Sequence, residues 1–137
     1  MSRRELDVAG LPEPISHYAD AVLAGDTLYI SGIVPVDEHG ALVGDDVAAQ
    51  ARQVFGLMGR VLAAAGGAPG DVAKVTVYLL DIDDRPRINP VRQAFFGDAR
   101  PASTLVEVSR LAVPGALLEI EAIAHLDPGR DSQPARG

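Results

Sequence analysis

Residues 117–125 read Leu-Leu-Glu-Ile-Glu-Ala-Ile-Ala-His and give the clearest indication of how this chain folds. Successive side chains of a β-strand point to opposite faces of the sheet, so one face of this segment is entirely apolar. That face carries Leu118, Ile120, Ala122 and Ala124. The other face combines Glu119 and Glu121 with Ile123. The pattern predicts a strand with one face in the hydrophobic core and one face that is neither dry nor fully solvated.

Other segments show strand patterns as well. Residues 72–80 alternate in the same way, with one apolar set (Val75, Val77, Leu79) and one mixed set (Lys74, Thr76, Tyr78). Further strands are predicted over 28–34 and 103–108, from alternation and β-branched content. A short strand over 21–24 is expected to pair with 28–34 through the two-residue turn Gly25-Asp26.

Two helices are predicted between these strands. Residues 45–65 carry apolar side chains at alternating spacings of four and three, namely Val47, Ala51, Val54, Met58, Val61 and Ala65, which is one face of a helix. A second helix is predicted over 87–96 and ends at Gly97. The order is strand, strand, helix, strand, helix, strand, strand. With both helices on one face of a mixed sheet, this predicts a two-layer α/β sandwich.

The length of 137 residues fits one domain, and 47% hydrophobic with 23% charged residues is the composition of a folded globular protein. We expect a single domain over 1–137, with its core at about 10–126. From residue 127 onward no apolar side chain other than proline is larger than that of alanine, so 127–137 is predicted to be a flexible tail.

Composition also excludes several classes of chemistry and partner. The chain has no cysteine, which excludes disulfides, thiolate-bound zinc and cysteine nucleophiles. A net charge of −7 opposes nucleic-acid binding, including the cleavage of RNA. No apolar run reaches the ~20 residues that a membrane span requires. We therefore expect a cytoplasmic protein with a small-molecule substrate and no membrane or nucleic-acid partner.

The mixed face of the sheet indicates self-association. A chain of this size cannot cover both faces of a sheet by itself, and an oligomer buries what the monomer leaves open. The sequence therefore predicts a closed homo-oligomer.

The clearest candidate for chemistry is the pair Glu119 and Glu121. Two residues apart on a strand, their carboxylates point the same way at a separation of ~7 Å. Such a pair can divide into an acid and a base if burial raises one pKa. Alternatively, both face water or an arginine of a neighbour, and Glu107 could take part in either arrangement.

Other polar residues have both structural and functional interpretations. His17, His39 and His125 show no metal-ligand spacing, so neither a metal nor a cofactor is predicted. Next to His17, Tyr18 could take part in proton transfer, although loop packing is the plainer interpretation. In Ser31-Gly32, the glycine is typical of a bulge or of a close approach of backbone to a ligand.

Several segments coincide in their spacing with one family. They are Ile30-Ser31-Gly32, Ala49-Gln50, the strand over 72–79, the segment over 89–96, Pro101-Ala102, Val106-Glu107-Val108, Leu111 and Glu119-Ile-Glu-Ala-Ile-Ala. Together they resemble the RidA/YjgF family over roughly residues 10–126. The resemblance implies a chorismate-mutase-like fold and a homotrimer, with three ligand sites in the clefts between subunits.

The resemblance also implies an activity, namely hydrolysis of reactive enamines and imines to a keto acid and ammonia. In that family an arginine holds the substrate carboxylate and a glutamate on the last strand handles the water. Position by position, the glutamate corresponds to Glu119, the site tyrosine to Tyr18, the serine to Ser31 and the asparagine to Asn89.

The carboxylate-binding arginine has no counterpart in this chain. The deaminating branch reads Pro-Ala-Arg-Ser, whereas this chain reads Pro101-Ala-Ser-Thr, so that Ser103 stands in place of the arginine. Leu105 likewise replaces a frequent cysteine, and Ile33 replaces a frequent glutamine. A charge-assisted arginine–carboxylate pair contributes roughly 1.5–3 kcal/mol, which one neutral hydroxyl does not match. Arg92, where the family often has an aromatic residue, could reach in from the helix instead.

Two hypotheses follow for the function. The first is a trimeric enzyme that acts on an enamine, an imine or a similarly tautomerisable molecule other than 2-aminoacrylate. In it Glu119 and Tyr18 are catalytic, and the substrate contacts Ser31, Gly32, Asn89, Arg92, Ser103 and Leu105. The alternative is a trimer that binds a small metabolite or has a regulatory role without turnover, since a fold can persist when its chemistry is lost.

Overall fold

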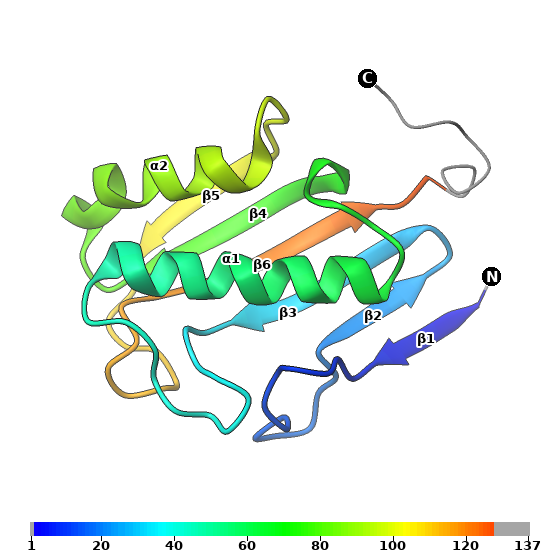
Figure 1. The fold of residues 1–137 in the computed structure, drawn as a ribbon, viewed down its shortest axis with the longest axis horizontal. Coiled ribbons are helices and arrows are strands. Elements are labelled where there is room, and N and C mark those ends of the chain that lie inside the picture. Colours follow the sequence, from blue (N-terminus) through cyan, green and yellow to red (C-terminus); the bar gives the residue numbers. More distant parts are fainter. Residues whose placement is uncertain (1, 128–137) are drawn as a thin grey trace.

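The computed structural model describes residues 2–127 as one six-stranded sheet with two helices packed on one face (Figure 1). The strands are β1 (Arg3–Leu6), β2 (Ala21–Ala24), β3 (Thr27–Ile33), β4 (Val72–Leu79), β5 (Ala102–Glu107) and β6 (Leu118–His125). Their order across the sheet is β1-β2-β3-β6-β4-β5. Only β4 and β5 run parallel, so the sheet is mixed as predicted.

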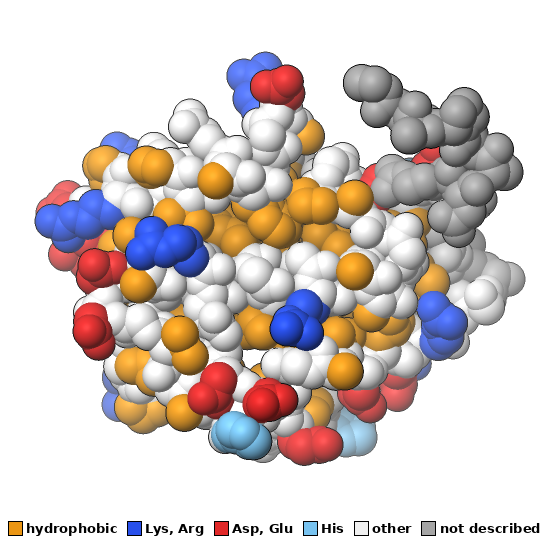
Figure 2. Space-filling view, in the orientation of Figure 1, with side chains coloured by type: hydrophobic (Ala, Val, Ile, Leu, Met, Phe, Trp, Pro, Cys, Tyr) orange, Lys and Arg blue, Asp and Glu red, His pale blue; other side chains and the backbone are white. Residues whose placement is uncertain are grey.

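The helices α1 (Val47–Ala64) and α2 (Arg85–Phe96) close the core against the sheet. The buried side of α1 carries the predicted Val47, Ala51, Val54, Met58 and Val61. Phe55 joins the two helices, with its ring centroid 4.9 Å from that of Phe95 and 5.6 Å from that of Phe96. Figure 2 views this side, where apolar side chains show between the helices and charged ones lie mostly around the margin.

The two faces of the sheet differ as the alternation predicts. Val75, Val77 and Leu79 of β4 are buried under the helices, together with Leu118, Ile120, Ala122 and Ala124 of β6. The intervening side chains lie on the opposite face, which neither α1 nor α2 covers (Figure 1). This open face carries Glu119.

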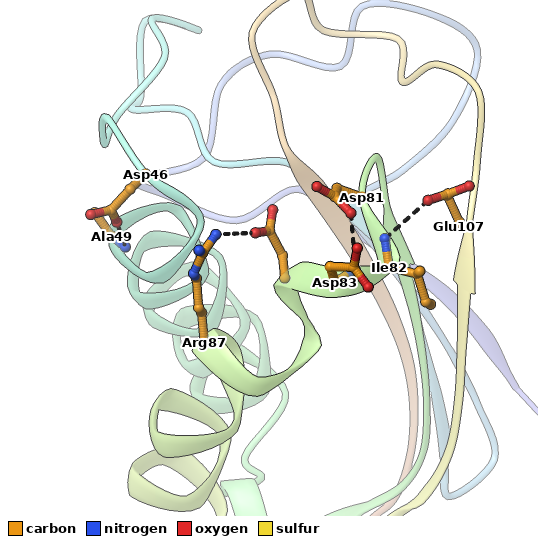
Figure 3. A network of polar contacts seen from close by, with 8 residues as sticks. Asp46, Ala49, Asp81, Ile82, Asp83, Arg87 and Glu107 are labelled. Atoms are coloured by element: carbon orange, nitrogen blue, oxygen red, sulfur yellow. Dashed lines mark hydrogen bonds and ion pairs between the residues drawn. The ribbon is translucent and has the colours of Figure 1, made fainter.

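Carboxylates fix the starts of both helices (Figure 3). Asp46 caps α1 by accepting a hydrogen bond from the backbone N–H of Ala49, at 2.8 Å. Before α2, the buried Asp84 accepts one from Arg87 at 2.6 Å, and Glu107 on β5 accepts one from the N–H of Ile82 at 3.0 Å. Glu107 therefore stabilises a turn and is not part of the Glu119 pair.

The predicted elements are confirmed, with ends that differ by one or two residues. The turn at Gly25-Asp26 is present, with Ala24 paired to Thr27 and a φ of 59° at Gly25. The predicted element order was incomplete, however, because β1 had not been predicted. It pairs with β2, and Leu6 and Val8 belong to the core. The predicted tail over 127–137 lies outside the described residues except for its first residue.

Candidate functional site

Glu119 lies near the start of β6 on the open face, opposite Tyr78 of β4. Its side chain is half-buried. Burial raises the pKa of the Glu119 carboxyl, and the nearby charge of Glu121 raises it further. A carboxyl group in this environment exchanges a proton more readily near neutral pH than a solvated one does.

Gly32 allows Glu119 to occupy this position. Between the pairs Ile30–Ala122 and Ile33–Ile120, β3 advances three residues while β6 advances two, which is a β-bulge at Ser31-Gly32. A Cβ atom on Gly32 would lie 2.1 Å from Glu119 Oε2. The sequence prediction for this glycine is thus confirmed as a bulge, and the close approach is to the carboxylate of Glu119.

A hollow of about 350 Å³ opens beside Glu119. Its wall is formed by Ile15, Ser16, Tyr18, Ser31, Gly32, Val34, Ala112 and Val113. The Ser31 hydroxyl donates a 2.6 Å hydrogen bond to the backbone carbonyl of Ala19, which ties the loop of Tyr18 to the bulge. The structure therefore brings together four of the predicted site residues, namely Glu119, Tyr18, Ser31 and Gly32.

The second carboxylate of the predicted pair has a different environment. Glu121 accepts a hydrogen bond from the Tyr78 hydroxyl, and this bond, followed by burial, raises the pKa of the tyrosine. Glu119 has no such donor among the described residues. The two carboxylates thus differ in hydrogen bonding.

The other predicted residues lie on a different surface. Ser103 on β5 pairs with Val75 and points to the helix face, and Leu105 packs against the core. Arg92 of α2 donates a 2.9 Å hydrogen bond from Nη2 to Ser103 Oγ. Asn89 and Arg92 line a second hollow of about 390 Å³ at the end of α2, which Arg100 also lines.

These two groups cannot contact one small ligand within a single chain. Glu119 and Ser103 face opposite sides of the sheet, and β4 separates their strands. Two strand spacings alone amount to about 10 Å. Only a neighbouring copy of the chain could bring one group against the other.

Lys74 and His39, two further polar residues of the sequence, have a structural contact and a solvated position respectively. Lys74 donates a 2.6 Å hydrogen bond to Thr104 on the neighbouring strand. His39 is exposed in a turn held by Asp37, which accepts from the N–H groups of residues 39 and 41. Among residues 2–127, no three side chains of metal-ligating type gather, and no helix is both long and apolar enough to cross a bilayer.

Sequence reasoning missed part of the wall around Glu119. Ile15 is 75% exposed on a loop without periodicity, so no pattern marked it. Ala112 and Val113 lie in another irregular loop, which the buried Gln50 holds in place. The Gln50 side chain donates to the carbonyls of Gly44 and Gly115 and accepts from the N–H of Leu117. The signal available in the sequence was Gln50 itself, a glutamine on the apolar side of the predicted helix.

Comparison with known proteins identifies the family to which the chain belongs. The family model described as Endoribonuclease L-PSP matches residues 9–126. The 3-aminoacrylate deaminase RutC of Acinetobacter baylyi is 40% identical over 118 residues, which cover 85% of this chain and 93% of that protein. The human 2-iminobutanoate/2-iminopropanoate deaminase is 39% identical over 127 residues, covering 92% of each chain.

Solved structures agree with these relatives. The crystal structure of RidA from a Psychrobacter species superimposes with a TM-score of 0.84 at 33% identity, covering 90% of this chain and 99% of that one. The chain therefore belongs to the RidA/YjgF family.

Proposed function

We propose that this protein is a homotrimeric enzyme that hydrolyses an enamine or imine, with Glu119 as its general acid and base. The observation that carries the proposal is the half-buried Glu119 carboxyl, whose pKa is raised and which lies against Gly32 at the edge of a hollow. Relatives named as imine and aminoacrylate deaminases support this reaction class.

The proposed reaction needs one group that both gives and takes a proton. Protonated Glu119 donates to the C=N nitrogen, or to the carbon of the enamine tautomer, and leaves an iminium carbon. The resulting carboxylate accepts a proton from the attacking water as the C–O bond forms. Loss of ammonia from the tetrahedral adduct then leaves a carbonyl product. Water is the only co-reactant, and Tyr18 and Ser31 orient the ligand from the wall of the hollow.

Separation of the predicted residues into two groups supports a site shared between copies. In the proposed trimer, Glu119, Tyr18, Ser31 and Gly32 of one copy face Asn89, Arg92 and the residue-103 region of the next. The partly apolar open face, where Tyr29 is 49% and Val106 38% exposed, supports association of this kind.

We further propose that 2-aminoacrylate is a poor substrate. Its recognition would depend on an α-carboxylate held from position 103, where this chain has serine. Ile33 and Leu105, which replace polar residues of the deaminating branch, pack in or against the hydrophobic core and line neither hollow. An imine or enamine that does not depend on an α-carboxylate fits Ser103 better.

Release of carbonyl product from imines formed in situ tests the proposal. An oxidase generates the imine, and semicarbazide traps the imine that has not been hydrolysed. The measured quantity is how far the protein lowers the amount of trapped imine. We expect Glu119→Gln to reduce the acceleration about 10²–10⁴-fold, the usual contribution of general acid–base catalysis. Glu107→Gln is the matched control, because Glu107 lies on the helix face and is expected to retain full activity.

No acceleration for any imine, together with saturable binding of carbonyl compounds, would contradict the enzymatic proposal. That result would favour the alternative of a metabolite-binding trimer. Rapid hydrolysis of 2-aminoacrylate would contradict the statement about that substrate and leave the role of Glu119 intact.

A further inference from the structure

Arg92 is a partly buried guanidinium without an acidic partner in the described part of the chain. Its one hydrogen bond runs from Nη2 to Ser103 Oγ, at 2.9 Å. A guanidinium carries five N–H donors in a fixed planar fork, so most of its donors remain available. By contrast, Arg87 on the same helix forms an ion pair with Asp84 at 2.6 Å.

The surroundings of Arg92 favour an anion. Burial lowers the pKa of the Arg92 guanidinium, and no neighbouring carboxylate counters that effect. The group nevertheless stays charged, because an arginine side chain does not lose its proton in proteins. A charge that has lost part of its hydration without gaining a counter-ion is stabilised by a bound carboxylate. The hollow of about 390 Å³ lined by Asn89, Arg92 and Arg100 leaves room for one.

The contact with Ser103 also fixes where the charge lies. A serine hydroxyl is bonded directly to Cβ, whereas the guanidinium of an extended arginine lies several bonds further from its own Cα. Because Arg92 Nη2 lies 2.9 Å from Ser103 Oγ, the guanidinium stays close to the β5 backbone. It is therefore set back from the point that an arginine at position 103 would reach. A ligand must extend further to contact it.

We propose that Arg92, held in position by Ser103, binds a carboxylate that lies beyond the α position of the substrate, so that the enzyme selects imines or enamines with a distal carboxylate. This inference rests on the proposed function for the reacting end of the ligand. The arginine that binds the carboxylate then lies on α2 instead of at position 103 of the strand. Arg92 and Ser103 together determine the length of the substrate.

Three carbonyl compounds with the same five-carbon skeleton test the inference without requiring turnover. They are 4-oxopentanoate, with a distal carboxylate, 2-oxopentanoate, with an α-carboxylate, and pentan-2-one, which has none. Dissociation constants are measured by calorimetry or by NMR titration of the full-length protein. We expect 4-oxopentanoate to bind more tightly than both of the others.

Variants then separate the carboxylate contact from general effects. Arg92→Gln should weaken binding of 4-oxopentanoate about 10- to 100-fold, the loss expected for one charge-assisted pair, and leave pentan-2-one unchanged. Arg85→Ala is the matched control, because Arg85 is an exposed arginine of the same helix that does not line this hollow, and it should change binding less than about threefold. The double variant R92S/S103R returns the charge to the strand and should shift the preference to 2-oxopentanoate.

The inference is overturned if Arg92→Gln weakens all three ligands alike, if it weakens none, or if Arg85→Ala has the same effect. These outcomes are independent of the proposed hydrolysis. A protein that binds 4-oxopentanoate through Arg92 but accelerates no imine hydrolysis supports the inference and refutes the enzymatic proposal. Loss of hydrolysis in Glu119→Gln, together with an unchanged ligand preference in Arg92→Gln, supports the enzymatic proposal and refutes the inference.

Discussion

Gly32 and Glu119 are packed so closely that a substitution of Gly32 tests whether activity depends on the position of the Glu119 carboxylate. A methyl group on Gly32 would meet Glu119 Oε2 at 2.1 Å, and a flexible side chain can relieve that overlap by turning away. We expect Gly32→Ala to fold and to lose about 10²-fold in imine hydrolysis, since displacement of a catalytic group by ~1 Å has an effect of that order. Activity at the wild-type level would contradict the role given to Glu119.

Gly56 supplies the control for this substitution. It lies inside α1, and nothing lies within 4 Å of the Cβ that alanine would add. Gly56→Ala should therefore raise the free energy of unfolding by about 0.5–1 kcal/mol and leave activity unchanged. The pair separates a displaced carboxylate from a general effect of adding a methyl group.

The raised pKa of Glu119 predicts a pH-dependent effect on stability. Because the folded state favours the protonated carboxyl, its stabilising contribution is complete below the ordinary pKa of 4.5 and is lost as the pH rises through the higher folded value. Gln in place of Glu119 keeps the neutral form at every pH. We expect Glu119→Gln to raise the melting temperature at pH 7 and to have no such effect below about pH 4.

Thermal unfolding of both proteins between pH 3 and 8 measures this difference. The substitution Asp20→Asn provides an internal comparison. Burial raises the pKa of the Asp20 carboxyl from 3.8, and an asparagine there can still accept the hydrogen bond from the N–H of Val8. A melting-temperature difference for Glu119→Gln that stays constant across this range would show that its carboxyl is not desolvated.

At the scale of the elements, Gln50 connects α1 to the loop that leads into β6. Its partly buried hydrogen bonds satisfy two backbone carbonyls and one backbone N–H, at distances of 2.7–3.2 Å. Leucine at this position would leave all three without that partner. We expect Gln50→Leu to lower the free energy of unfolding by about 2–4 kcal/mol, measured by urea denaturation.

Gln53, one turn further along α1, is the natural control. It makes one side-chain hydrogen bond, a 2.8 Å contact with the carbonyl of Val36, and its side chain is half-buried. Gln53→Leu should cost about 1 kcal/mol. Equal effects of the two substitutions would show that the loop before β6 does not depend on Gln50.

Local patterns determine most of these elements, and the exceptions have a physical cause. Alternation identified β4 and β6 because each has one buried face. Strand β1 escaped prediction because it is an edge strand whose first three residues are exposed, with the side chains of Arg3 and Glu5 paired at 2.8 Å. Charged edge strands of this kind protect a sheet from unwanted pairing and carry no apolar period.

The candidate site was predictable only in part, for a related reason. Glu119, Ser31 and Gly32 lie on strands and could be placed by register, and the bulge followed from the glycine. Tyr18 and the apolar wall lie on irregular loops, whose course no local period describes. The Arg92–Ser103 contact depends on how α2 packs beside β5, which is a tertiary relation between residues 11 positions apart.

At the scale of the whole molecule, the uncovered face of the sheet requires an explanation. Tyr29 is 49% exposed there, beside Ile123 of β6, and Lys74 of β4 lies on the other side of Ile123. Three copies that pack these faces together would bury the apolar part. Light scattering should therefore give three times the chain mass of 14.3 kDa.

Ile123→Lys is the substitution that tests this assembly. It adds a second ammonium beside Lys74, its neighbour across β4 and β6, within the proposed interface. A charge desolvated without a partner opposes association by several kcal/mol, so monomers should predominate at micromolar concentration. Ala63→Lys adds the same charge on the exposed side of α1 and should leave the trimer intact. Imine hydrolysis should disappear with the trimer, because Glu119 and Arg92 then have no common cleft; a fully active monomer would refute the shared site.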